Sequence, residues 1–204
     1  VGSHLADYLL KITDWTIHGM CRWRSPKENV EHLFPMVNAK NRIFFHYGDL
    51  CDYISMQNVI EDVKPDYVFH LAAQSYPKTS FSSPINTLDT NIQGTENLLE
   101  AMRKCSNIDP WIHVCSSSEV YGRVEKKDMP ISETNNISPI NPYAVTKAYQ
   151  DLLSQVYNKS FGLKIIITRM FSYNNARRKN LFQTAFAKQI VDCERGNRKI
   201  VEHG

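Results

Sequence analysis

The sequence lacks several features that would each point to a particular class of protein. Its five cysteines form no CxxC pair and no His/Cys cluster has zinc spacing, so we expect no metal site. No stretch approaches the roughly 18 apolar residues that a membrane-spanning helix needs, so we expect no membrane insertion. The net charge is only +3 and long basic runs are absent, so the sequence does not indicate a nucleic-acid partner.

The composition is that of an ordinary globular protein. With 204 residues, 42% of them hydrophobic and 22% charged, the chain has the size of one domain, or of one domain with part of a second. Its scattered cysteines favour reduced thiols and a cytoplasmic location. The chain begins as if within a helix and ends just after a strand begins, so we expect both ends to belong to a longer protein.

Predicted strands and helices alternate along the chain. Apolar runs predict strands at residues 16–21, 42–47, 67–73, 111–115 and 164–170, and a strand begins again near residue 200. Between them, helical periodicity predicts helices at about residues 5–10, 54–63, 84–104, 143–161 and 182–194. The strands are continuously apolar, as expected of strands buried on both faces. The predicted fold class is therefore α/β, a doubly wound parallel sheet of the Rossmann-like type, truncated at both ends.

Tyr143 and Lys147 form the motif with the most chemical content. Four residues apart on a helix, their side chains face the same way. A neighbouring ammonium favours the phenolate, so we expect Lys147 to lower the pKa of Tyr143 and make it an acid/base catalyst near neutral pH. The motif alone also fits a surface helix whose lysine stem lies along the protein. Its position after a strand that ends in polar residues favours the catalytic interpretation.

Ser117 and Glu119 follow the strand that precedes this helix. Ligands of parallel sheets bind at the carboxyl ends of strands, which is where these residues fall. A serine hydroxyl there can hydrogen-bond a substrate oxygen, and a partly desolvated glutamate can act as a base. The alternative is a polar turn that only caps the end of the strand. Because Tyr143 and Lys147 come next along the chain, we favour a catalytic role.

Earlier strand ends carry candidate ligands for a dinucleotide. Gly2 opens a helix, where a glycine permits close packing on a strand and directs amides at a pyrophosphate. Arg22 and Arg24 follow the next strand, where arginine in place of an acidic residue accepts a 2′-phosphate and favours NADP. Asp49 and Leu50 could hold the adenine amino group. A solvated basic turn and a helix cap are the plain structural alternatives.

Small residues end the predicted strand at residues 67–73. Leu71, Ala72 and Ala73 leave room for a bound cofactor, although small side chains also serve close packing. Asn91 lies inside the following helix, where asparagine is mildly unfavourable. We expect its side chain to bind backbone groups of adjacent strands, in a structural role.

Together these segments resemble the extended short-chain dehydrogenase/reductase family, and within it the GDP-mannose 4,6-dehydratases. The resemblance covers nearly all of the chain, and the segments that carry it are Gly48–Leu50, His70–Ser75, Ser80-Phe81, Asn91–Thr95, Asn97–Ala101, Ser117–Gly122, Pro142–Lys147, Arg169–Phe171 and Arg177-Arg178. It implies that residues 1–204 form an NAD(P)-binding Rossmann-like domain without its first strand. It also implies that most of the C-terminal part, which binds the nucleotide sugar, is absent.

The activity that the resemblance implies is the conversion of GDP-mannose to GDP-4-keto-6-deoxymannose. An enzyme of this kind, with NADP bound, oxidises C4 of the hexose, eliminates water across C5 and C6, and returns the hydride to C6. NAD is the alternative cofactor, and a homo-oligomer is the implied assembly. A related 4-keto-reductase or epimerase, and a catalytically silent dinucleotide-binding protein, are the alternative interpretations.

The resemblance assigns roles to individual residues. Tyr143 removes the proton of the C4 hydroxyl, Lys147 holds the nicotinamide ribose, Ser117 binds the C4 oxygen and Glu119 takes the C5 proton. The implied cofactor-binding residues are Gly2, Arg22, Arg24, Asp49, Leu50, Leu71, Ala72, Ala73, Tyr143, Lys147 and Arg177. The implied substrate-binding residues are Ser75, Ser118 and Ser172.

The loop after the last predicted strand departs from the family pattern. Residues 172–176 lack the usual proline before the double arginine, and Lys179-Asn180 replaces an expected glycine. The basic cluster Arg177-Arg178-Lys179 could bind phosphates of the cofactor or the substrate, or be a solvated surface run.

Overall fold

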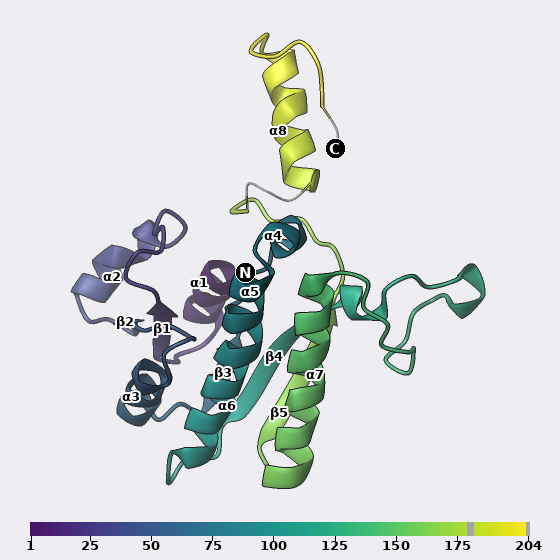
Figure 1. Cartoon of the computed structure of the whole chain (residues 1–204). Coiled ribbons are helices and arrows are strands. Elements are labelled where there is room, and N and C mark those ends of the chain that lie inside the picture. Colours follow the sequence, from purple (N-terminus) through teal and green to yellow (C-terminus); the bar gives the residue numbers. More distant parts are fainter. Residues whose placement is uncertain (179–181, 203–204) are drawn as a thin grey trace. The chain divides into compact units, whose positions relative to one another are not determined.

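The computed structural model describes residues 1–178 and 182–202 (Figure 1). The chain divides into a main unit of residues 2–171 and a C-terminal unit that comprises Val1 and residues 172–204. The helices of the main unit are α1 (Gly2–Ile12), α2 (Phe34–Asn38), α3 (Tyr53–Val63), α4 (Pro77–Ser82), α5 (Pro84–Leu88), α6 (Gly94–Lys104) and α7 (Pro142–Phe161). Its strands are β1 (Ile17–Cys21), β2 (Ile43–Tyr47), β3 (Tyr67–His70), β4 (Trp111–Ser117) and β5 (Lys164–Met170). Short 3-10 turns are η1 (Glu31–Leu33), η3 (Ser118–Tyr121) and η4 (Lys126–Asp128).

The strands of the main unit, all of whose residues are described, run parallel and form two sheets. β1 pairs with β2, and β3, β4 and β5 form the second sheet in that order, with Ser117 opposite Met170. This arrangement confirms the parallel α/β fold that the alternation of elements predicts. The carboxyl ends of β3, β4 and β5 lie at the same edge of their sheet.

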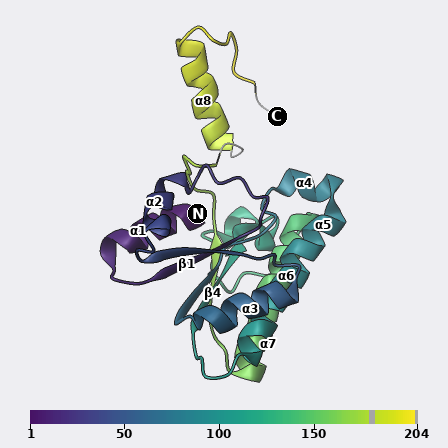
Figure 2. The same cartoon turned by 90° about the vertical axis from the view of Figure 1, so that its left-hand side faces the viewer.

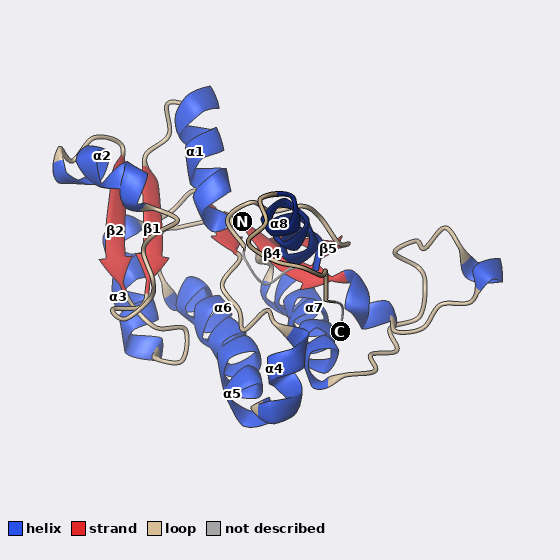
Figure 3. Ribbon diagram, turned by 90° about the horizontal axis from the view of Figure 1, so that it is seen from above, coloured by secondary structure: helices blue, strands red, loops and turns tan. Residues whose placement is uncertain are grey.

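Helices lie on both sides of the strands. α1 and α2 are on one side, and α3, α5, α6 and α7 are on the other (Figures 2 and 3). The main core forms between this second group and the sheet, where Leu99 of α6 meets Ile112 and Val114 of β4. The start of α6 approaches the end of the second predicted strand closely: a Cβ added to Gly94 would lie 2.7 Å from the Cβ of Leu50. Only a glycine permits this contact without a shift of the backbone.

The helix predicted over residues 84–104 is confirmed, with one irregular turn inside it. A π-helical turn, Asp89–Gln93, joins α5 to α6, and the backbone stays helical from Pro84 to Lys104. Asn91 lies in this turn and is fully buried. Its Oδ1 accepts from the Gln74 backbone N–H at 2.7 Å, and its Nδ2 donates to the Gln74 carbonyl at 3.0 Å and to Thr146 Oγ1 at 2.9 Å. The structural role predicted for Asn91 is confirmed, with the segment after β3 as its partner.

β3 is shorter and more exposed than predicted. It ends at His70, so Leu71, Ala72 and Ala73 lie beyond the strand. Tyr67 and Phe69 are 49% and 40% exposed, so the expected burial on both faces is wrong here. The reason is that α6 and α7 pack on the opposite face of this sheet.

The C-terminal unit contains α8 (Phe182–Glu194), which matches the predicted helix. The strand predicted near residue 200 is not present among the described residues of this unit. Instead, the Glu202 backbone N–H donates to Gln189 Oε1 at 2.7 Å, so the segment folds back to α8 rather than extending into a sheet. Within residues 1–178 and 182–202, no helix is long and apolar enough to cross a membrane.

Candidate active site

The amino end of α7 is fixed by side chains on both sides of it. Asn141 is the N-cap, and its Oδ1 accepts from the Ala144 N–H at 2.8 Å. Ser80 of α4 is fully buried, and its Oγ accepts from the Tyr143 N–H at 3.2 Å. Two of the amide donors that a helix start leaves without helical partners are therefore satisfied, and the backbone of Tyr143 is held in place.

Tyr143 and Lys147 lie together inside the protein. Both are buried, and the Lys147 Nζ lies 5.9 Å from the centre of the Tyr143 ring. The same Nζ donates to the carbonyl of Cys115 on β4 at 2.9 Å. Burial lowers the pKa of Lys147 from 10.5 to about 8, because an ammonium loses solvation there. The alternative of a solvent-exposed lysine lying along a surface helix is therefore wrong for this pair.

Ser117 and Glu119 mark the end of β4 and the start of η3. Ser117 Oγ accepts from the Glu119 N–H at 3.2 Å, so the capping alternative for this turn is correct. This turn also makes a second contact, in which the Glu119 Oε2 accepts from Asn141 Nδ2 at 2.7 Å. Asn141 therefore links the carboxylate to the helix that carries Tyr143.

The four predicted catalytic residues are supplied by three adjoining elements, β4, η3 and α7. Lys147 contacts β4 through the Cys115 carbonyl, and Ser116 Oγ lies 3.4 Å from the Lys147 carbonyl oxygen. Glu119 contacts the N-cap of the same helix. The helix that carries the phenol and the ammonium is therefore hydrogen-bonded both to the strand that ends at Ser117 and to the turn that carries Glu119. Side chains of these types can perform acid/base chemistry at a hydroxylated carbon.

Apart from Tyr143 and Lys147 on α7, the predicted cofactor-binding residues occupy loop positions after the strands and the start of α1. Arg22 and Arg24 are exposed in the turn after β1. The Asp49 carboxylate accepts from the Cys51 N–H at 3.0 Å, and Leu50 is buried, so both also have structural roles. Open space surrounds the Cα of Gly2, so the expected close helix–strand approach at this glycine is not present.

Two predicted residues lie in the C-terminal unit. Ser172 is exposed, and the backbone N–H of Arg177 donates to Asn175 Oδ1 at 3.0 Å. The roles predicted for Ser172 and Arg177 remain predictions. Lys179 and Asn180 lie outside the described residues.

Comparison with known proteins decides the family. A family model described as GDP-mannose 4,6 dehydratase matches residues 1–204, which is the whole chain. The chain belongs to the GDP-mannose 4,6-dehydratase family. The resemblance that its motifs carry is therefore confirmed.

Members of the GDP-mannose 4,6-dehydratase family match over most of this chain. It is 35% identical to the GDP-mannose 4,6-dehydratase of Vibrio cholerae over 187 residues, which are 90% of this chain and 50% of that protein. It is 33% identical over 189 residues to the GDP-mannose 4,6 dehydratase of Homo sapiens, with the same two shares. The chain thus spans about half the length of the curated relatives it matches.

Solved structures extend the comparison beyond the GDP-mannose 4,6-dehydratase family. The dTDP-glucose 4,6-dehydratase DesIV from Streptomyces venezuelae, solved with NAD and TYD, is 26% identical with a TM-score of 0.80, covering 94% of this chain and 59% of that one. RMD from Pseudomonas aeruginosa, complexed with NADPH, is 26% identical with a TM-score of 0.72, covering 90% and 63%. These neighbours support the Rossmann-like fold.

Three features of this GDP-mannose 4,6-dehydratase family site did not enter the sequence prediction. Asn141 precedes Pro142, and an asparagine before a proline is a recognisable start of a helix. Ser80 belongs to a segment that carries the family resemblance, but its contact with α7 was not predicted, because the contact joins residues far apart in the sequence. The same holds for the bond between Asn91 and Thr146.

Proposed function

We propose that the protein is a nucleotide-sugar dehydratase that converts GDP-mannose to GDP-4-keto-6-deoxymannose. The observation that carries the proposal is the buried pair Tyr143 and Lys147 beside the turn that holds Ser117 and Glu119. Tyrosine and lysine suit hydride chemistry at a hydroxyl, whereas the carboxylate adds a base for elimination. The names of the relatives agree with this assignment.

Each residue has a distinct task in the proposed reaction. Tyr143 accepts the proton of the C4 hydroxyl, and the adjacent ammonium of Lys147 stabilises the phenolate. Ser117 donates a hydrogen bond to the C4 oxygen as it becomes a ketone. Glu119 takes the proton from C5, which the C4 ketone makes acidic. The protonated Glu119 carboxyl then gives this proton to the C6 hydroxyl, which departs as water while the C5–C6 double bond forms.

The residues present fit a nicotinamide dinucleotide. An ammonium carries three donors, so Lys147 can bind ribose hydroxyls in addition to the Cys115 carbonyl. Ala72 and Ala73 place small side chains after β3, and Ser75 and Ser118 are the proposed contacts to the sugar. A bound dinucleotide would supply the hydride acceptor for oxidation at C4 and the hydride donor for reduction at C6.

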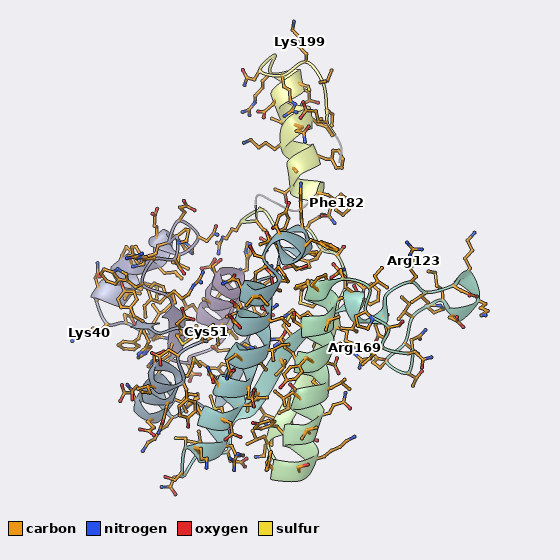
Figure 4. The ribbon with its side chains drawn as sticks, in the orientation of Figure 1. Lys40, Cys51, Arg123, Arg169, Phe182 and Lys199 are labelled. Carbon is orange, nitrogen blue, oxygen red and sulfur yellow. The ribbon has the colours of Figure 1, made fainter. Side chains whose placement is uncertain are left out.

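NADP is the proposed form of the cofactor. Arg22 and Arg24 are exposed after β1, where their guanidinium groups can pair with a 2′-phosphate. Replacing both with alanine should weaken NADP binding about tenfold or more and leave NAD binding nearly unchanged. Calorimetric titration with each dinucleotide measures this, with Arg123→Ala as an exposed control (Figure 4). Tighter binding of NAD than of NADP by the unaltered protein would contradict the assignment.

A 4-keto-reductase or epimerase is the second candidate, since it uses the same Tyr143 and Lys147. Glu119 favours the dehydratase, because it adds a base for elimination.

The deciding experiment incubates the full-length protein with GDP-mannose and NADP and analyses the product by mass spectrometry. Loss of one water without net cofactor reduction is expected, and an unchanged GDP-mannose mass would refute the proposal. Glu119→Gln should still oxidise C4 but no longer eliminate water. A catalytically silent dinucleotide-binding protein would neither oxidise C4 nor eliminate water.

The proposed assembly is a homo-oligomer that forms through α7. Val145, Leu152 and Val156 are each about half exposed at spacings that place them on one helix face. Phe81 of α4 and Ile85 of α5, on helices that contact α7, extend this apolar surface. A two-fold axis would pair the surface with its own copy. Leu152→Glu should then reduce the mass measured by light scattering, whereas Ile54→Glu on exposed α3 should not.

Two further proposals concern domain and location. We propose that another parallel strand completes the Rossmann-like domain between β1 and β3. A complete Rossmann sheet has the strand order 3-2-1-4-5-6, and such a strand would join the two sheets in that order.

The five free cysteines suit a reducing compartment, so we propose that the protein is cytoplasmic.

A further inference from the structure

Asn141 makes two hydrogen bonds that no smaller or charged side chain makes together. Its Oδ1 accepts from the Ala144 N–H at 2.8 Å, and its Nδ2 donates to Glu119 Oε2 at 2.7 Å. The backbone N–H requires an oxygen, so the amide nitrogen must face the carboxylate. Because one planar group makes both bonds, the position of Glu119 depends on where α7 begins.

The segment between Glu119 and Asn141 is held together by a hydrogen bond near its two ends, which brings these residues close to each other. Glu119 and Asn141 are 22 residues apart, but the Ser138 N–H donates to the Val120 carbonyl at 2.8 Å. Gly122 has a φ of 63°, and an added Cβ would overlap the Ser138 carbonyl oxygen. Residues 123–137 therefore form an extended loop (Figure 1). The two ends of this loop hold Glu119 against the N-cap residue of α7.

We propose that Asn141 is a positioning residue that holds the Glu119 carboxylate oriented for removal of the C5 proton, an inference that rests on the proposed dehydratase activity. The hydrogen bond from Asn141 ties the base of elimination to the helix that carries Tyr143, so that oxidation and elimination act on one bound sugar.

Asparagine is suited to this task because its alternatives each lose one bond. Aspartate caps a helix equally well but places a second carboxylate beside Glu119. Serine also caps through its hydroxyl oxygen, but its side chain is one bond shorter than that of asparagine, so the capping hydroxyl does not reach Glu119 as Nδ2 does. Both variants should therefore fold, and each removes the donor to Glu119.

The test compares Asn141→Asp and Asn141→Ser with the unaltered full-length protein, using GDP-mannose and NADP. In Asn141→Asp, the acid limb of the pH profile for water loss should move to higher pH by about one unit or more. Asn141→Ser should lower kcat for water loss about tenfold at an unchanged KM. In both variants, transient nicotinamide reduction, which reports C4 oxidation, should persist. Asn135→Asp, which adds the same charge in the neighbouring exposed loop, should leave the profile in place.

A second measurement separates this inference from the proposed function. Carbon-13 NMR titration of the Glu119 carboxyl, assigned with Glu119→Gln, needs no activity. The elements packed against η3 also carry Tyr143, Lys147, Asp151 and Arg169, which the variants leave unchanged. A titration midpoint that rises in Asn141→Asp supports the contact, even if the unaltered protein releases no water and the dehydratase proposal fails. A midpoint and pH profile that stay the same in Asn141→Asp overturn the inference.

Discussion

Lys147→Met should make the protein more stable at neutral pH while removing its activity. The lysine is 4% exposed, and its ammonium is hydrogen-bonded to the uncharged Cys115 carbonyl. Burial lowers the pKa of Lys147 to about 8, so the protonated form is less favourable in the folded chain than in the unfolded chain. Methionine fills a similar volume without a charge.

The two pKa values give the size of the effect. The fall from 10.5 to about 8 corresponds to about 3 kcal/mol of destabilisation at pH values below 8. Between pH 8 and 10.5 the unfolded chain binds more protons than the folded chain, so stability rises with pH across that window. Losing the hydrogen bond to Cys115 costs about 1 kcal/mol. We therefore expect Lys147→Met to raise the free energy of unfolding by about 2 kcal/mol at pH 7.

Urea unfolding at a series of pH values measures this difference. The gain should shrink from pH 8 upward and disappear before pH 10.5. Lys159→Met, the same substitution at an exposed position near the end of α7, provides the control and should change stability little at any pH. The reasoning is refuted if Lys147→Met is less stable at pH 7, or if its difference from the unaltered protein does not vary across the window.

Two further predictions concern stability. Arg169→Met should lower the free energy of unfolding by about 3–5 kcal/mol, because the fully buried Asp151 loses a guanidinium 2.8 Å away (Figure 4). A loss in urea unfolding below about 1 kcal/mol, as for an exposed pair, would contradict this. Gly122→Ala should cost about 1–3 kcal/mol and loosen residues 123–137, because its positive φ and the Ser138 carbonyl leave no room for a Cβ. Limited proteolysis of this loop should then be faster, and unchanged cleavage would count against the argument.

The sequence predicts those elements that are long and strongly patterned. The helix beginning near Tyr143 and the strand at Lys164–Met170 agree with the structure to within one residue. The π turn at Asn91 was not predictable, because one inserted residue hardly changes the hydrophobic periodicity. Its buried amide was still recognisable as out of place in a helix.

In the candidate site, too, the local contacts could be predicted from the sequence, whereas the long-range contacts could not. Tyr143 and Lys147 are four residues apart on one helix, so their proximity can be predicted from the sequence spacing alone. The contact of Glu119 with Asn141 depends on how the intervening loop closes, and local pattern contains no information on that. The exposure of Tyr67 and Phe69 was missed because it depends on which face of the sheet the helices cover.

The bonds of Asn91 have a consequence for the order of events in folding. They join positions 17 and 55 residues apart, so they form only after long loops have closed. We therefore expect Asn91→Ala to speed unfolding in stopped-flow experiments and to change the refolding rate little, a φ-value near zero. A refolding rate that falls in proportion to the loss of stability would show instead that this junction forms early, before the transition state.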